Sequence, residues 1–256
     1  MAKLQCMARV VQAEQLAEGV FSMYLHAPEI AVQAVSGQFI SLYCDDSDKL
    51  LPRPISLCEV DKETGTLRIV YRVVGAGTEE FSKKKQGSFI RILGPLGNGF
   101  PLEDKKAILI GGGIGIPPML QLAKELPGEV TVVVGYRDDQ TFLLRELEAA
   151  ADYVVVATED GSVGTKGNVI DAIRAEHVTG DVIYSCGPMP MLRGVKQWGL
   201  ENHIPTWLSL EEKMACGIGA CLACVCQSTE VDPHSNVKNK RICKDGPVFL
   251  STEIEL

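Results

Sequence analysis

Residues 213–226 read KMACGIGACLACVC, and the rest of the chain is best understood from this stretch. Cys216, Cys221 and Cys224 have the spacing C-x4-C-x2-C, and Cys243 follows after eighteen intervening residues (225–242). This spacing is typical of plant-type ligation of a [2Fe–2S] cluster, with three thiolates from one loop and a fourth from further along the chain. The glycines between the cysteines let backbone N–H groups turn toward the inorganic sulfides. We therefore predict that these four cysteines hold a [2Fe–2S] cluster.

Three other uses of these cysteines compete with the cluster. A structural zinc site usually combines two close Cys/His pairs, and Cys243 has no nearby mate. A Rieske centre needs two histidine ligands, and His234 is the only histidine in the region. A disulfide framework is typical of an extracellular chain. Cys226 is a spare thiol, which we expect to be buried or to lie beside the ligands rather than to be one.

Composition excludes several classes of function. The 256 residues, of which 46% are hydrophobic and 23% charged, are typical of a folded protein with one large or two ordinary domains. A net charge of −8 argues against nucleic acid or anionic membrane as a partner. No run approaches the roughly 20 apolar residues that span a bilayer, and the N-terminus lacks a signal-peptide core. Nine cysteines without a secretion signal lead us to expect a soluble, cytoplasmic protein.

The first hundred residues alternate apolar and polar side chains in short runs. Such runs occur at residues 7–14, 20–27, 37–44, 66–73 and 88–95, separated by Gly, Pro and Asp. Period-2 runs with these breaks predict short antiparallel strands that close into a barrel. We assign this barrel to residues 1–100.

Two motifs on this barrel have the chemistry of a dinucleotide site. The first is the tetrapeptide RPIS at residues 53–56, and the second is GAGT at residues 75–78. The Arg53 guanidinium is suited to a pyrophosphate, and a helix start presented by glycines offers free N–H donors. The Ser56 hydroxyl is a donor for a flavin ring nitrogen. The plain alternative is that Arg53 is a surface arginine and that the glycines form an ordinary turn.

Together, and in this order, the two motifs resemble the flavin-binding half of the ferredoxin–NADP reductase family. Many members have an aromatic residue between the Arg and the Ser, where this chain has Pro54 and Ile55, so Tyr71 is the nearest substitute for stacking on the ring. The resemblance implies FAD, lined by Arg53, Pro54, Ile55, Ser56, Val70, Tyr71, Arg72, Gly77 and Thr78.

After the turn-rich segment at residues 94–101, strand-like and helix-like patterns alternate. Apolar runs predict buried strands at 107–110, 130–134, 153–157 and 182–185. Helical spacing follows each of them, at 119–126, 142–150, 169–175 and 189–198. This alternation predicts a doubly wound, parallel α/β domain over residues 101–210.

Two motifs fall at the carboxyl ends of these strands, where such sheets bind ligands. The loop at 111–118 reads GGGIGIPP, whose glycines allow a phosphate to approach the backbone, although Pro118 takes the place of the third glycine of a Rossmann fingerprint. The turn at 185–191 reads SCGPMPM and resembles the pyridine-nucleotide domain of the same reductases. That resemblance puts Cys186 beside the nicotinamide, although a buried structural cysteine is the alternative. The residues implied for NAD are Gly112, Gly113, Gly115, Cys186, Gly187, Pro188 and Met189.

The end of the third strand bears on the choice of nucleotide. Glu159 and Asp160 would repel the 2′-phosphate of NADP and suit a free ribose diol. Arg137 is the opposing observation, because one arginine can serve a phosphate. We predict NAD.

The order of barrel, nucleotide sheet and short cluster segment (211–256) resembles one family over nearly the whole chain. It is the electron-transfer subunit of class 1B, NAD-dependent dihydroorotate dehydrogenase. The motifs RPIS, LGPLGNGFP, GGGIGIPP, SCGPMPML and CKDGPVF, with the cysteine loop, carry this resemblance. It implies FAD, one [2Fe–2S] cluster, NAD, and a partner subunit that carries FMN and the dihydroorotate site, in a heterotetramer with two subunits of each kind.

The implied function is electron transfer from dihydroorotate, oxidised at the partner's FMN, through the cluster and FAD to NAD+ in pyrimidine (UMP) biosynthesis. We find no acid–base residue for dihydroorotate and therefore expect no catalytic residue on this chain. The nearest alternative is the small flavin/iron–sulfur subunit of an NADH-dependent ferredoxin:NADP or sulfide oxidoreductase. A third hypothesis is a redox-sensing or zinc-stabilised module that binds the dinucleotide only as a regulator.

Overall fold

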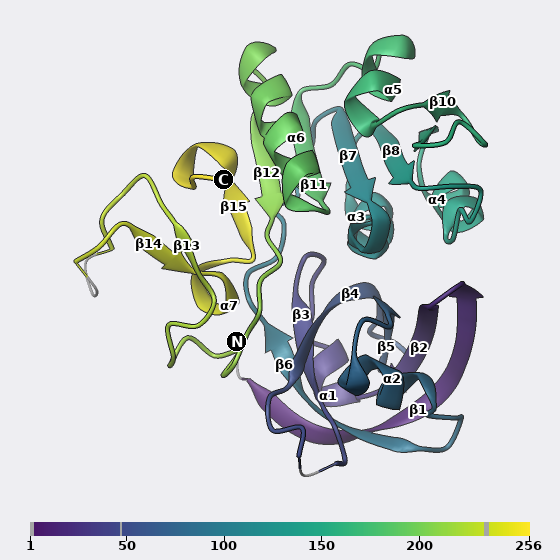
Figure 1. Cartoon of the computed structure of the whole chain (residues 1–256), viewed down its shortest axis with the longest axis vertical. Helices are drawn as coiled ribbons and strands as arrows, with labels where there is room; N and C mark the ends of the chain where they lie inside the picture. The colour runs from purple at the N-terminus through teal and green to yellow at the C-terminus, as the bar shows by residue number, and fades with distance from the viewer. Residues whose placement is uncertain (1–2, 47, 233–235) are drawn as a thin grey trace.

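The computed structural model describes residues 3–46, 48–232 and 236–256. A barrel, an α/β sheet above it and a C-terminal segment beside both make up the chain (Figure 1). His234, the histidine weighed for a Rieske centre, lies outside the described residues. No helix in the described part of the chain is long and apolar enough to cross a membrane.

Six strands close the barrel in the order β1-β2-β5-β4-β3-β6, and every neighbouring pair is antiparallel. The structure therefore confirms the barrel that the alternating pattern predicted. One face of each strand fills the interior with fully buried side chains such as Leu25, Ile40 and Ile69. Two short helices accompany these strands. The bounds are β1 (Leu4–Ala17), β2 (Val20–His26), α1 (Pro28–Ala31), β3 (Phe39–Tyr43), β4 (Arg53–Asp61), β5 (Thr66–Arg72), α2 (Ala76–Ser82) and β6 (Phe89–Leu96).

The second part is a seven-stranded sheet in the order β10-β9-β8-β7-β11-β12-β15. All pairs are parallel except β12 with β15, and helices pack on both faces, so the predicted doubly wound architecture is confirmed. Its elements up to residue 209 are β7 (Ala107–Gly112), η1 (Gly113–Gly115), α3 (Pro117–Glu125), β8 (Val130–Tyr136), α4 (Leu144–Ala150), β9 (Tyr153–Thr158), β10 (Thr165–Lys166), α5 (Val169–Ala175), β11 (Val182–Cys186), α6 (Met189–Glu201) and β12 (Thr206–Ser209).

The C-terminal segment is not an independent unit. It contains the hairpin-like pair β13 (Val225–Gln227) and β14 (Asn239–Arg241), then α7 (Ile242–Asp245), β15 (Val248–Leu250) and η2 (Ser251–Glu253). β15 pairs with β12 and so extends the nucleotide sheet at its edge. The cysteine loop that precedes β13 is thereby held beside both the barrel and the sheet (Figure 1).

A buried arginine joins the barrel to the α/β part. Arg68 of β5 is 3% exposed, and its Nη1 lies 2.6 Å from Glu59 Oε2 and 3.1 Å from Glu146 Oε2 of α4. Lys124 of α3 pairs with the same Glu59. Burial raises the pKa of Glu59, but hydrogen bonds from Lys124 and Arg68 outweigh burial and lower that pKa overall. The network therefore fixes how the two parts pack.

Replacing Arg68 by Met should cost roughly 3 kcal/mol of unfolding free energy, because two facing carboxylates lose their shared cation while Lys124 still compensates one of them. The loss should be full above pH 4.5 and shrink as the pH falls through the lowered pKa of Glu59. Urea unfolding followed by circular dichroism measures it. Lys83→Met, which removes an exposed pair with Glu79, is the control and should change stability by less than about 0.5 kcal/mol. Equal midpoints for the Arg68→Met and parent chains would contradict this account.

Candidate functional site

A cavity of about 500 Å³, here the Arg53 cavity, lies between the barrel and the start of the C-terminal segment. Eight of the nine residues predicted for FAD line it, and the ninth, Gly77, lies against Arg53. The opposite wall was not predicted. The cavity lining comprises Arg53, Pro54, Ile55, Ser56, Val70, Tyr71, Arg72 and Thr78 from the prediction, with Phe39, Val74, Ile114, Leu210, Glu211, Glu212, Lys213, Met214 and Pro247.

Gly77 is a glycine for a steric reason. A Cβ atom at this position would lie 2.1 Å from Arg53 Nε, so no larger residue leaves the guanidinium where it is. The turn before it is held by Thr78, whose Oγ1 accepts from the N–H groups of Val74 at 3.0 Å and Gly75 at 3.2 Å. The two predicted motifs begin 22 positions apart, at residues 53 and 75, and lie on different elements. They meet at one cavity and form a cradle that fits a flavin dinucleotide.

Glu211 links this cavity to the CGP turn. Its carboxylate is open to the cavity yet surrounded by protein atoms, and this burial raises its pKa. The Cys186 thiol donates to Glu211 Oε1 across 3.9 Å. Cys186 is itself fully buried, and burial followed by the nearby Glu211 charge raises its pKa well above the usual value. The thiol is therefore protonated and inert near neutral pH.

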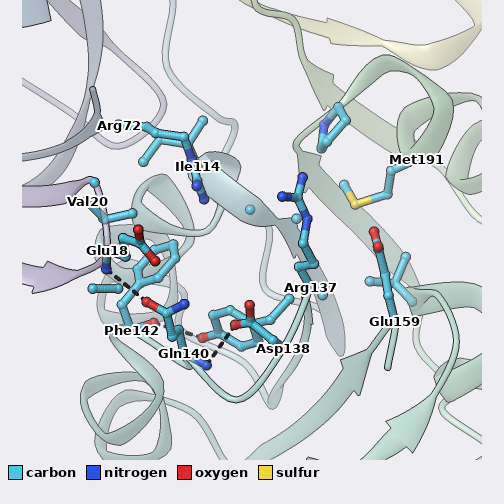
Figure 2. Close-up of a pocket in the computed structure, with 18 of the residues that line it drawn as sticks. Glu18, Val20, Arg72, Ile114, Arg137, Asp138, Gln140, Phe142, Glu159 and Met191 are labelled. Carbon is cyan, nitrogen blue, oxygen red and sulfur yellow. Dashed lines mark hydrogen bonds between the residues drawn. The ribbon is translucent and has the colours of Figure 1, made fainter. Parts of the chain in front are cut away.

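A second cavity of about 730 Å³, here the Arg137 cavity, lies between the nucleotide sheet and the barrel. Gly112, Gly113 and Pro188 line it, as predicted, and the turn between β1 and β2 closes one side. Figure 2 shows Arg72 descending beside Ile114 and Arg137 extending toward Met191. At the rim, the Glu18 N–H donates to Gln140 Oε1 at 2.8 Å, which joins the barrel to the loop after β8.

The structure brings the glycine loop and the CGP turn together. A Cβ on Gly112 would lie 2.4 Å from Met191 Sδ, and a Cβ on Gly115 would lie 2.3 Å from the Cys186 carbonyl oxygen. Only glycine permits this approach. Four residues predicted for NAD lie outside the lining of the two cavities, namely Gly115, Cys186, Gly187 and Met189, while Met191 lines the Arg137 cavity.

The two carboxylates that follow β9 differ in their surroundings. Glu159 lines the Arg137 cavity (Figure 2). Asp160 instead accepts from the hydroxyl of Ser162 at 2.7 Å and from its N–H at 2.9 Å. These two hydrogen bonds hold the pKa of Asp160 below its usual value. Of the pair, only Glu159 therefore lines this cavity.

The four predicted cluster ligands meet at one end of the C-terminal segment as two pairs. Cys216 Sγ and Cys221 Sγ are 3.2 Å apart and half-buried. Cys224 and Cys243 are buried, and the Cys243 N–H donates to Cys224 Sγ at 3.4 Å. Within the described ranges, no three metal-binding side chains converge on one point. Two thiol pairs fit a cluster of two irons better than a single tetrahedral zinc ion.

Backbone donors surround these thiols, as expected for a cluster loop. Burial raises the pKa of Cys216, but N–H groups of Ile218, Cys221 and Ala220 outweigh burial and lower it to about 6. Burial and then Cys224 raise the pKa of Cys243 to about 12, although the Gly219 N–H donates to its sulfur at 3.1 Å. Metal binding must therefore expel the proton of Cys243. Cys226 is half-buried, donates to the Lys240 carbonyl at 3.6 Å, and lies outside the two pairs.

Three family models match consecutive parts of the chain. The FAD-binding domain of oxidoreductases matches residues 8–100, and the oxidoreductase NAD-binding domain matches residues 109–197. The iron–sulfur cluster binding domain of dihydroorotate dehydrogenase B matches residues 211–255. The barrel, the sheet and the cysteine loop thus correspond to binding domains for FAD, NAD and an iron–sulfur cluster.

Relatives match over the full length. The chain is 44% identical to the dihydroorotate dehydrogenase B (NAD(+)) electron transfer subunit of Listeria monocytogenes serotype 4a, over 99% of this chain and 100% of the relative. It is 42% identical to the protein of that name from Geobacillus kaustophilus, with 96% and 97% covered. A structure of NADH-dependent reduced ferredoxin-NADP oxidoreductase superposes with a TM-score of 0.87 at 31% identity, covering 98% of this chain and 90% of the other. This chain therefore belongs to the family of electron transfer subunits of dihydroorotate dehydrogenase B (NAD(+)), an oxidoreductase family.

Proposed function

We propose that this chain passes electrons from dihydroorotate, oxidised at the FMN of a partner subunit, through a [2Fe–2S] cluster and FAD to NAD+. The adjacency of three sites carries the proposal. Arg72 and Ile114 line both cavities, and residues 210–214 line the Arg53 cavity and run directly into the cysteine loop. When bound, FAD exchanges electrons in pairs with NAD and singly with a cluster, which suits the middle position.

We assign FAD to the Arg53 cavity. Arg53, seated against Gly77, is the donor for the pyrophosphate, and the Ser56 hydroxyl faces the same space. The flavin ring is proposed to lie along the wall that Val70 and Tyr71 form. Tyr71 is buried, and its ring stacks on that of Phe21 with the ring centroids 6.1 Å apart. Residues 210–214 form the opposite wall.

We assign NAD to the Arg137 cavity. Gly112 and Gly113 allow the backbone to approach a phosphate, and the CGP turn packs against that loop through Met191. The guanidiniums of Arg72 and Arg137 face this cavity from the two parts of the chain, and neither forms an ion pair or hydrogen bond within the described residues. They are the donors that we propose for the pyrophosphate of the nucleotide. Cys186 is buried outside the lining of this cavity, and we propose that it supports the CGP turn.

The division of the chain and its assembly complete the proposal. We divide it into a barrel (1–100), a nucleotide part (101–210) and a cluster segment (211–256). Cys216, Cys221, Cys224 and Cys243 are the proposed cluster ligands. The first three lie on a loop whose Ile218 and Leu222 are exposed apolar side chains, and Cys243 lies in α7. We propose that two such chains assemble with two FMN-containing catalytic subunits. None of the nine cysteines, all of which lie in the described ranges, forms a disulfide, and this supports our proposal of a location in the reducing cytoplasm.

Gly77→Ala should weaken FAD binding about 10- to 100-fold. The new Cβ displaces Arg53 and so removes a charge-assisted contact worth roughly 1.5–3 kcal/mol, although alanine itself favours the helix. Flavin retained per chain after gel filtration, and a dissociation constant from flavin fluorescence, measure the change. Gly75→Ala is the matched control, since a Cβ there meets nothing within 4 Å. If both variants retain flavin like the parent chain, Arg53 is not the phosphate donor.

Glu159→Gln should lower the preference for NADH over NADPH about 10- to 100-fold. The substitution removes the carboxylate at the end of β9, which is the one of the Glu159–Asp160 pair that lines the cavity, and a tenfold change corresponds to about 1.4 kcal/mol. The ratio of kcat/KM for the two nucleotides, with a dye as electron acceptor, measures it. Asp160→Asn should change the ratio much less, because Asp160 is engaged by Ser162. An unchanged ratio in Glu159→Gln would remove this residue from nucleotide selection.

Cys221→Ser tests the order of the three sites. The variant should keep NADH-dependent dye reduction, which needs only the two cavities, and lose orotate-dependent NADH oxidation when co-expressed with an FMN subunit. Cys226→Ser should keep both activities, because Cys226 lies outside the thiol pairs. Orotate turnover by the parent chain without a partner would refute the division of labour. Ferredoxin-linked NADP reduction without orotate activity would favour the alternative oxidoreductase function.

A further inference from the structure

A buried hydroxyl without a partner lies next to the cysteine loop. Among the described residues, two buried side-chain oxygens make no hydrogen bond, Ser41 Oγ and Ser185 Oγ. Ser41 is 0% exposed and lies in the middle of β3. A buried polar atom left unpaired is costly, so it calls for a specific explanation.

The strand alternation directs Ser41 out of the barrel and toward the C-terminal segment. Ile40 and Leu42, on either side of it, point into the barrel core. Phe39 points to the other face and belongs to a hydrophobic cluster that also contains Cys224 and Cys243. The Ser41 hydroxyl therefore stands on the apolar face that packs against the cysteine loop.

Gly217 brings the loop onto this hydroxyl. A Cβ atom on Gly217 would lie 3.0 Å from Ser41 Oγ and 3.4 Å from Leu96 Cδ1, and Gly217 has a φ of +66°. Both the close approach and the left-handed backbone favour glycine here. Because Gly217 follows Cys216 directly, the hydroxyl lies beside a proposed ligand. On its other side, Ser41 pairs in register with Pro54, which lines the Arg53 cavity.

We propose that the Ser41 hydroxyl donates a hydrogen bond to a sulfur of the iron–sulfur site, either an inorganic sulfide or the Cys216 thiolate. Such a donor stabilises the more negative, reduced form and so raises the reduction potential of the cluster. The proposal rests on the proposed function, because it requires a cluster at the two thiol pairs. Ser41 is then a tuning residue between the two redox sites, and it contributes no ligand.

The test is the cluster midpoint potential of Ser41→Ala, from a redox titration followed by electron paramagnetic resonance, on the co-expressed complex. At a fixed potential the ratio of reduced to oxidised cluster should fall about tenfold, which is a shift of about 59 mV for one electron. The FAD midpoint, followed by visible absorbance, should not change. In H2O, the parent chain should show the hyperfine coupling of one proton near the cluster that disappears after exchange into D2O, and the variant should lack this coupling.

Ser185→Ala is the matched control, since it removes the other unpaired buried hydroxyl, in β11, and should leave the cluster potential unchanged. If Ser41→Ala fails to take up iron, Ser41→Cys is the second test, because it keeps a weaker donor. An intermediate shift of the cluster midpoint potential in Ser41→Cys supports the proposal, and no shift overturns it. An unchanged cluster potential, or a shift of the FAD potential alone, would also overturn it. Absence of iron from the parent chain would instead refute the proposed function itself.

Discussion

Residues 211–256 are too few to bury a core of their own, and this constraint fixes the arrangement of the sites. Their buried side chains, among them Met214, Cys224 and Cys243, join one hydrophobic cluster with residues of the barrel and of the sheet. Pairing of β15 with β12 anchors the C-terminal end of this segment to the nucleotide sheet. The segment that carries the thiols can therefore fold only on the other two parts, which holds the cysteine loop at one place relative to both cavities.

Backbone contacts also hold this junction. A Cβ on Gly97 would lie 2.4 Å from Pro247 Cδ, and the Asn98 N–H donates to the Gly246 carbonyl at 2.6 Å. The Leu210 N–H donates to the Pro247 carbonyl at 2.9 Å. Pro247 and Leu210 are both walls of the Arg53 cavity. A displacement of the C-terminal segment would consequently open the Arg53 cavity as well as move the thiols, so the two proposed redox sites are coupled through the main chain.

Local patterns predicted the elements that bury a long apolar face. The α5 bounds, Val169–Ala175, agree with the predicted helix, and β7, β8, β9 and β11 extend one or two residues beyond the predicted strands. β12 and β15 were missed because four and three residues carry no period, and their antiparallel pairing joins segments that are distant in sequence. The cavity walls at 17–20 and 210–214 were missed for the same reason, since packing of whole domains creates them and no local motif does.

Neighbouring residues of one type need not act together, and the acidic pair after β9 illustrates why. Sequence reasoning treated Glu159 and Asp160 as one repulsive surface against a 2′-phosphate. In the structure, the Asp160 carboxylate accepts a hydrogen bond from the Ser162 N–H, because a short carboxylate readily reaches the N–H two residues ahead. Glu159, with a longer side chain and no such turn to satisfy, extends into the cavity opposite Arg137. Electrostatic selection among nucleotides would then depend on all the charged side chains that line the cavity, and carboxylates and guanidiniums act on a 2′-phosphate in opposite directions. The sign of the preference would follow from which of these charged groups lies nearest the ribose, and Glu159, at the end of β9, is the residue that we propose for that position.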